Sequence, residues 1–226
     1  MHKTMDNAEA QQCLQSLMRV WFDFERRLNR VPIIQRLENG EFTQQDYLSL
    51  LLNLRQQVIE GSRWITRSAS SFDRHYSEIR SQVINHAKDE HRDYLLLEQD
   101  FVALGGDLAA IQAGARNIGS EALHGYLMYR ASRPNPVDMI GAMWMIEGLG
   151  EKMASNWADR IDELIALGGE KTCFLRYHGH NDASHLETFC HMLDSVCRES
   201  TTHRAIVKTA QVVARLYCMQ LDEIDG

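Results

Sequence analysis

Two stretches of this chain, INHAKDEHRDY (residues 84–94) and YHGHNDASHLE (residues 177–187), repeat one spacing of side chains that can bind metal ions. Successive residues of an α-helix are rotated by about 100°, so positions i, i+4 and i+7 lie on one face. Both stretches place nitrogen or oxygen donors at these positions: His86, Glu90 and Asp93 in the first, and His178, Asp182 and His185 in the second. The spacing predicts two helices whose donor rows could face each other across a helical bundle.

The rest of the chain also has a helical pattern. Apolar residues recur at three- and four-residue intervals, and alternating segments typical of strands are absent. The pattern predicts about seven helices, at residues ~7–30, ~44 to the late sixties, ~74–104, ~120–132, ~137–167, ~171–198 and ~201–222. Short connections imply antiparallel neighbours. We therefore expect an all-α, single-domain helical bundle that spans residues 1–226.

Several boundaries of these helices are marked by particular residues. Pro32 follows the first helix, and the segment LENGEFT (residues 37–43) is expected to be a loop. Thr43 with Asp46 has the pattern of a capping box, which predicts that the second helix begins there. Gly105 and Gly106 are expected to end the third helix, because glycine is common just after a helix.

Glu147 lies in the segment MIGAMWMIEGLGEKM (residues 139–153), which is otherwise almost entirely apolar around it. An isolated carboxylate is costly to bury, so Glu147 should be neutralised, paired with a cation or bound to a metal. No Arg or Lys lies within one turn on its own face, which makes Glu147 the best candidate for a bridging carboxylate. The neighbouring large apolar residues are expected in the core: Met139, Met143, Trp144 and Met145.

Glu60 has two interpretations. Dinuclear carboxylate sites in helical bundles take one ligand from each of several helices, and Glu60 could supply a carboxylate from a further helix. It could equally lie near solvent beside Arg63 or Arg67. His180 is rotated away from His178 and is not expected to bind metal, whereas His91 is expected to be exposed unless it replaces Asp93 as a ligand.

A histidine and an acid four residues apart also form ordinary pairs on a helix surface. One such stretch alone would not support a metal site. The recurrence of the spacing, together with an acid in the apolar segment between the two stretches, strengthens the metal interpretation, and on spacing alone both interpretations stay open.

Composition limits the other classes of function. The formal net charge is −7 and no run of Lys or Arg is long enough to form a basic stripe, so nucleic acid and anionic membranes are not expected partners. The five cysteines form no C-x-x-C motif, and no apolar run approaches the ~20 residues of a membrane span. We expect a cytoplasmic protein with free thiols.

These motifs, in this order, resemble the haem-oxygenase-like fold shared with the TenA thiaminase and PqqC proteins. Within that fold, they are most similar to the haem-oxygenase-like di-iron oxidases and oxygenases. The resemblance extends over about residues 40–195 and rests on three features: Glu90 and His91 ahead of a segment that ends in Leu104 and Gly105, the lone acid Glu147, and the motif of His178, Asp182 and His185.

The chain departs from the family pattern on its first ligand helix. Asp93 stands where the family usually has a histidine, and His86 stands where several members have a carboxylate. Two interpretations follow and remain open. The ligand set is rearranged, with histidine and acid exchanged, or one metal site is weak, binds another metal or is empty.

The resemblance implies a non-haem iron centre, with two Fe(II) ions expected and Mn as an alternative metal. The implied ligands are His86, Glu90, Asp93, Glu147, His178, Asp182 and His185, with Glu60 as a further candidate. Such a centre would use O₂ to cleave a C–H or C–C bond, or to oxidise an amine, of a small-molecule substrate. The substrates of this group include amino acids and fatty acids, and the family default is a homodimer.

Two rival functions remain at this stage. The first is a metal-free enzyme like TenA or PqqC, which would be favoured by a catalytic cysteine beside a pocket acid. The second is a non-catalytic binding protein of the same fold, which Asp93 favours. Haem oxygenase itself is disfavoured, because the first predicted helix contains no histidine and His2 precedes it.

Overall fold

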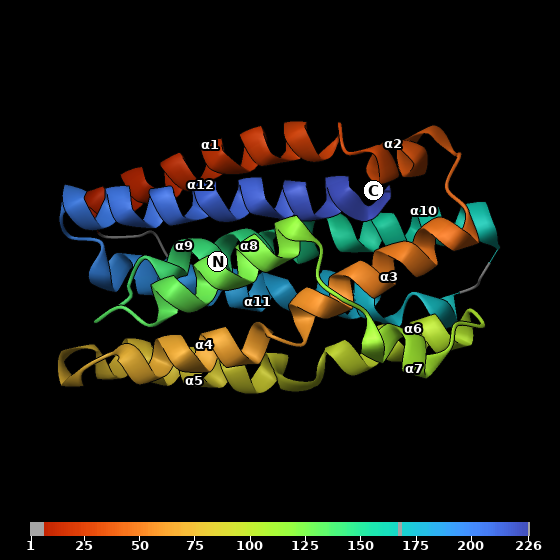
Figure 1. Ribbon diagram of the computed structural model, residues 1–226. Helices are drawn as coiled ribbons and strands as arrows, with labels where there is room; N and C mark the ends of the chain where they lie inside the picture. Colours follow the sequence, from red (N-terminus) through yellow and green to blue (C-terminus); the bar gives the residue numbers. More distant parts are fainter. Residues whose placement is uncertain (1–6, 167–168, 226) are drawn as a thin grey trace.

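The computed structural model describes residues 7–166 and 169–225, and throughout this part of the chain the regular structure is helical. Figure 1 shows the long helices packed roughly side by side. Helices at one edge of the molecule are α1 (Ala8–Leu28) and α12 (Ser200–Asp222), and those at the opposite edge are α4 (Gly61–Ser71) and α5 (Ser77–Asp89). Between these edges lie α8 (Ile118–Ala131), α9 (Met139–Leu149) and α11 (Cys173–Val196).

The remaining helices lie between these long helices in the chain. They are α2 (Pro32–Asn39), α3 (Gln44–Val58), α6 (Tyr94–Ala103), α7 (Leu108–Ala113) and α10 (Ser155–Ile165). Three pairs are nearly continuous: α3 with α4, α5 with α6 through the 3₁₀ turn η2 (Glu90–Arg92), and α9 with α10 through the π-helical turn η3 (Gly150–Ala154). If each pair counts as one bent helix, the described residues form about nine helices.

The predicted all-α bundle is confirmed, but the predicted number of seven helices was too low. The two missed helices, α2 and α7, have only 8 and 6 residues, too few for a periodic apolar pattern to be evident. The segment predicted as a loop at residues 37–43 is therefore partly helical. The predicted helix end at Leu167 lies outside the described residues.

Local sequence explains where several helices begin and end. The predicted capping box is present, with the Thr43 hydroxyl 3.2 Å from the Asp46 amide and the Asp46 carboxylate 2.8 Å from the Thr43 amide. Pro32 begins α2, where its missing N–H costs no helical hydrogen bond. Gly40 and Gly105 end α2 and α6 with φ of 79° and 88°, a conformation that glycine adopts most readily.

Helix α9 forms the centre of the core. All of its residues except Ile146 are buried, including Met139, Met143, Trp144 and Met145, as predicted. It packs against α11 and α12. Its one charged residue is Glu147, which is only 3% exposed, so α9 brings a carboxylate into the middle of the molecule. No helix in the described ranges is both long and apolar enough to cross a membrane.

Candidate metal centre

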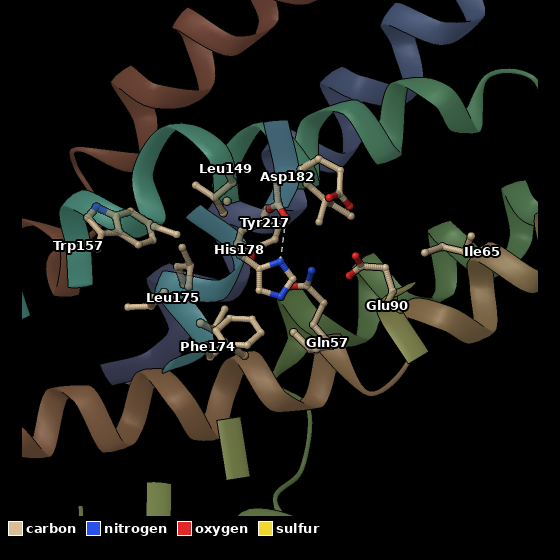
Figure 2. A pocket seen from close by; sticks show the side chains of 18 of the residues that line it. Gln57, Ile65, Glu90, Leu149, Trp157, Phe174, Leu175, His178, Asp182 and Tyr217 are labelled. Atoms are coloured by element: carbon tan, nitrogen blue, oxygen red, sulfur yellow. Dashed lines mark hydrogen bonds and ion pairs between the residues drawn. The ribbon is translucent and has the colours of Figure 1, made fainter. Parts of the chain in front are cut away.

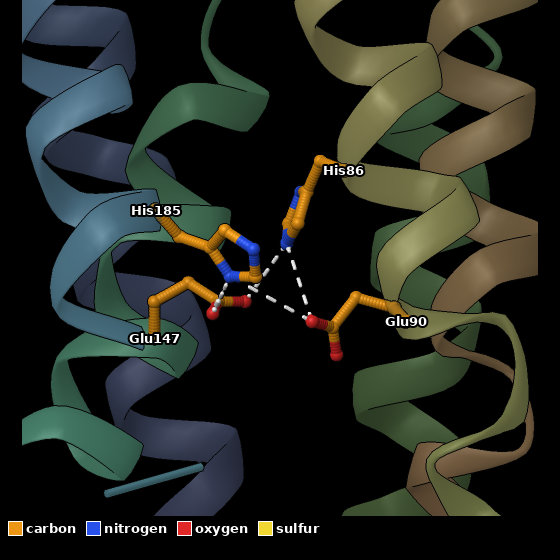
Figure 3. A group of neighbouring side chains, drawn as sticks. All are labelled: His86, Glu90, Glu147 and His185. Carbon is orange, nitrogen blue, oxygen red and sulfur yellow. Dashed lines mark hydrogen bonds and ion pairs between the residues drawn. The ribbon is translucent and has the colours of Figure 1, made fainter. Parts of the chain in front are cut away.

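Three helical segments bring the candidate ligands together. Helix α5 carries His86, and the 3₁₀ turn that follows it begins at Glu90 and ends before Asp93. Helix α9 carries Glu147. Helix α11 carries the second predicted row, His178, Asp182 and His185. Figure 3 shows His86 and Glu90 of the first row pointing toward Glu147 and toward His185 of the second row.

The first group consists of His86, Glu90, Glu147 and His185, whose ligand atoms all lie within 4.8 Å of one another (Figure 3). Glu147 accepts contacts at both oxygens, with His86 Nε2 3.0 Å from Oε1 and His185 Nδ1 2.8 Å from Oε2. One oxygen of Glu90 lies 3.9 Å from His86 Nε2 and 3.7 Å from His185 Nδ1. Two imidazoles and two carboxylates therefore surround one point.

The second group consists of Glu90, Asp93 and His178, also within 4.8 Å of one another. The Nε2 atom of His178 lies 3.5 Å from Asp93 Oδ2, and its Nδ1 atom lies 3.1 Å from Asp182 Oδ1. Asp182 is thus placed behind the imidazole, where it can fix the orientation of His178. Glu90 belongs to both groups, so the two groups are adjacent and share one carboxylate.

The residues present fit a metal ion by a test that is independent of the spacing. The Nε2 atom of His178 and the Oδ2 atom of Asp93 are both buried, and neither has a hydrogen-bond partner. Buried polar atoms of native proteins are nearly always satisfied, and each exception needs an explanation. A cation between these two atoms would satisfy both. A mixed set of imidazoles and carboxylates suits iron or manganese.

The charges of the site also favour a cation. Burial, followed by the negative charges of Glu147, Asp93 and Asp182, raises the pKa of Glu90 to about 11. Burial likewise raises the pKa of Asp182 to about 6. Burial opposes ionisation of Glu147, but the charge of His86 and the hydrogen bonds from the two histidines lower its pKa to about 2. The carboxylates must therefore share a proton or a metal cation, which binds in exchange for protons.

Glu60 lies outside both groups. It caps the N-terminus of α4, where its carboxylate pairs with Arg63 at 2.8 Å and with Arg116 at 2.9 Å. His124 approaches it to 4.0 Å. Of the two interpretations that the sequence left open for Glu60, the structure matches the pairing with Arg63, but the expected position near solvent was wrong, because Glu60 is buried at 9% exposure. The further partner, Arg116, is too distant in sequence for a local pattern to reveal.

The two other histidines near the ligands are exposed. His91 has its Nδ1 atom 3.5 Å from the Ser62 hydroxyl, and His180 donates from Nδ1 to the backbone oxygen of Arg176 at 2.6 Å. Neither belongs to a ligand group, in agreement with the expectation for His180 and with the exposed alternative for His91.

Gly150 contributes to the site in a way that sequence spacing did not indicate. A Cβ atom on Gly150 would collide with the Asp182 carboxylate, so only glycine leaves room for this side chain. Gly150 also begins the π-helical turn η3, three residues after Glu147. Such turns are often found at functional sites. The one sign of this in the sequence was a glycine inside an apolar helical segment, which often marks a place where another part of the chain packs closely against the backbone.

A cavity adjoins the candidate ligands (Figure 2). It has a volume of about 80 Å³ and is partly open to solvent. Its walls are mostly apolar, with contributions from Leu54, Ile65, Trp157, Phe174, Leu175 and Leu221. Four candidate ligands line it, namely Glu90, Glu147, His178 and Asp182, and no Arg or Lys does so among the described residues. A bound molecule would therefore place apolar groups beside the site.

Solved structures with the same fold are similar over nearly the whole chain. A domain of unknown function with a haem-oxygenase-like fold from Shewanella denitrificans OS217 has a TM-score of 0.85 and 19% identity, covering 92% of this chain and 89% of that one. A TenA homologue from Pseudomonas syringae pv. tomato DC3000 has a TM-score of 0.76 and 11% identity, covering 97% and 93%. A TenA homologue from P. horikoshii OT3 has a TM-score of 0.77 and 11% identity, covering 94% and 97%.

The family assignment comes from the sequence comparison. A search of curated proteins finds no match to this chain. A family model described as iron-containing redox enzyme matches residues 75–218, a range that includes every candidate ligand from His86 to His185 and excludes Glu60. Together with the haem-oxygenase-like fold, this match shows that the chain belongs to the haem-oxygenase-like family of iron-containing redox enzymes.

Proposed function

We propose that this chain binds two iron ions and uses O₂ to oxidise an apolar small molecule in the adjoining cavity. The observation that carries the proposal is the sharing of Glu90 by two neighbouring groups of buried and partly buried ligands. Glu90 would then be the bridging carboxylate, a role that the sequence had suggested for Glu147. Glu147, held between His86 and His185, would bind one ion only.

Each side chain would have a defined task. His86, Glu147 and His185 would hold one ion, Asp93 and His178 the other, and Asp182 would hold the imidazole of His178 in position. Two bound iron ions would supply the reduction of O₂ that side chains alone cannot perform. The apolar wall of the cavity would place the substrate beside the ions and keep water away from them.

The lining of the cavity favours one substrate class over another. A free amino acid carries both an ammonium and a carboxylate group, and the cavity offers no Arg or Lys for the carboxylate. A molecule that places an apolar group beside the ions, such as a fatty-acid-like substrate, would match the apolar walls better. Gln57 and Tyr217 are polar lining groups outside the ligand set, and they could orient a polar group of the substrate.

The rival metal-free enzyme receives little support. A thiaminase-like hydrolase would need a nucleophilic cysteine at the cavity, and no cysteine of the described residues lines it. The non-catalytic alternative would leave His178 Nε2 and Asp93 Oδ2 buried 3.5 Å apart, with no hydrogen bond and without a function. The metal interpretation explains both the shared carboxylate and these two atoms.

Metal analysis tests the proposal. The protein is loaded anaerobically with Fe(II), and iron per chain is measured in the parent and in His178→Ala. We expect two ions per chain in the parent and at most one in the variant. His180→Ala, an exposed histidine of the same helix, is the matched control and should keep two. No bound iron in the parent, or full iron content in His178→Ala, would contradict the proposal.

A further inference from the structure

A second groove lies on the outer surface of the molecule, between α4 and α5, at the edge opposite α1 and α12 (Figure 1). It differs from the interior cavity in its charge. Its lining includes Arg63, Arg67, Lys88 and His91, with Ile84 and Met128 as apolar members. No Asp or Glu of the described residues lines it, although the whole chain has a formal net charge of −7. The cationic groove is thus a local exception on an acidic protein.

The cationic side chains of the groove are accessible from solvent, and few acids lie near them. Arg67, Lys88 and His91 are exposed, and Ile84 is 52% exposed. Two acids lie near its margin. Glu60 pairs with Arg63, and the exposed Asp89 approaches His185 to 3.8 Å on the other side of the chain. Lys88 has no ion pair with any described residue, so its charge is available to a partner.

The groove and the candidate metal centre are formed in part by the same segment of the chain. Ala87 and His91 line it, and each follows a candidate ligand, His86 and Glu90, in sequence. Successive residues of a helix are rotated by about 100°, so the segment that carries these ligands also lines the groove. Such a position would give an external molecule a short path to the centre.

The proposed chemistry requires electrons from outside the protein. Reduction of O₂ to two molecules of water consumes four electrons and four protons. A two-electron oxidation of the substrate supplies two of these electrons, so a separate donor must supply the other two. The inference therefore rests on the proposed function. Proteins that deliver electrons form small, transient complexes, which are steered by complementary charge.

We propose that this groove docks an acidic electron-transfer protein with an iron–sulfur or flavin group, which delivers electrons to the centre across η2. The exposed cations would attract the acidic face of the donor, and Ile84 with Met128 would provide an apolar contact at the centre of the interface. The segment that holds His86 and Glu90 would separate the donor from the metal ions.

Binding to the metal-free protein tests the docking without any catalysis. The probe is an oxidised plant-type ferredoxin, which is acidic and carries one [2Fe–2S] cluster, and its affinity is measured by calorimetry at low salt. Arg67→Glu with Lys88→Glu should weaken binding at least tenfold. The matched control is Arg19→Glu with Arg215→Glu, which changes exposed residues of α1 and α12 by the same charge. It should weaken binding less than twofold.

Electron transfer separates the docking inference from the proposed function. Iron-loaded parent and both variants are supplied with O₂ and either reduced ferredoxin or dithionite, and oxidation of the donor is followed by absorbance. We expect the groove variant to lose the ferredoxin reaction at least tenfold and to keep the dithionite reaction. Absence of binding to the parent, or equal weakening in both variants, would overturn the docking inference. A parent that binds ferredoxin but consumes no electrons from either donor would instead overturn the proposed function.

Discussion

Glu90 belongs to both ligand groups, and ionisation of its carboxyl group is strongly disfavoured in the metal-free protein. Burial, followed by the negative charges of Glu147, Asp93 and Asp182, raises its pKa to about 11. A carboxylate that destabilises the metal-free protein, and that a bound cation would neutralise, is typical of functional sites, where residues needed for activity often lower the stability of the fold.

Replacement of Glu90 by Gln should therefore stabilise the metal-free protein. A folded pKa above the ordinary value of 4.5 means that the stability contributed by the protonated form is complete below pH 4.5 and is lost progressively as the pH rises toward 11. Gln does not titrate, so Glu90→Gln should unfold with a free energy about 1–3 kcal/mol higher than the parent at pH 8, and about equal at pH 4.5. Denaturant titrations at both pH values measure this difference.

The control for this comparison is Glu121→Gln, because Glu121 is an exposed acid with a 3.6 Å contact to Arg116. It should show no such dependence on pH. A Glu90→Gln protein that is no more stable than the parent at pH 8 would show that the buried carboxylate is not a source of instability. The iron-loaded variant should in turn lose affinity for both ions.

At the residue scale, the spacing i, i+4 and i+7 predicted that His178, Asp182 and His185 share one helix, and α11 is continuous through all three. The spacing did not separate their places: His178 and His185 belong to different ligand groups, and Asp182, predicted as a ligand, belongs to neither. The sharing of Glu90 could not be predicted, because it depends on the break into η2 after Asp89 and on the distance between two helices. The interpretation of Glu60 required Arg116, a partner more than fifty residues away.

At the scale of secondary-structure elements, the contact between η3 and α11 determines where Asp182 lies. The π-helical turn follows Glu147 directly, and Gly150 leaves the space that the Asp182 carboxylate occupies. Both residues therefore bring α9 and η3 close to α11: the Glu147 carboxylate contacts His185, and Gly150 leaves room for Asp182.

The variant Gly150→Ala should displace Asp182 and release the imidazole of His178. We expect iron content to fall from two ions per chain to about one, because the group around His86 does not depend on Asp182. Crowding of this kind destabilises proteins by about 1–3 kcal/mol, so the fold should be retained. Gly125→Ala is the control, since a Cβ atom there would meet nothing within 4 Å. Unchanged iron content in Gly150→Ala would show that Asp182 has no part in holding the metal.

The junction between α3 and α4 depends on Glu60 for stability rather than for metal binding. Glu60→Gln removes the charge that Arg63 and Arg116 share, and should lower the free energy of unfolding by about 1–3 kcal/mol. Iron per chain, measured by elemental analysis, should remain that of the parent. If this variant bound less iron than the parent, Glu60 would have to be a metal ligand after all.

At the scale of the whole molecule, the fold followed from the sequence because apolar periodicity is strong in long helices. All seven predicted helices are present, and the capping box and the glycine at the end of α6 fixed two boundaries. The short α2 and α7 were missed because few residues contribute to their pattern. The cationic groove could not be predicted from the sequence either, since its charged residues come from separate helical segments and form no run in the sequence.

Iron should stabilise the whole bundle, because the ligands are spread over α5, η2, α9 and α11 and come together only in the folded state. A ligand that binds only the folded protein at a hundred times its Kd adds about 2.7 kcal/mol. Anaerobic addition of Fe(II) should therefore raise the Tm by several degrees, and a chelator should reverse the change. A Tm that is independent of iron would argue against a metal site in the core.

The proposed site holds two metal ions side by side that share Glu90. Crystals grown with Fe(II) under anaerobic conditions, with diffraction data collected on both sides of the iron absorption edge, test this arrangement. We expect two anomalous peaks about 3.5–4 Å apart, with Glu90 in contact with both, His86, Glu147 and His185 at one, and Asp93 and His178 at the other. A single peak, or two peaks that do not share Glu90, would contradict it.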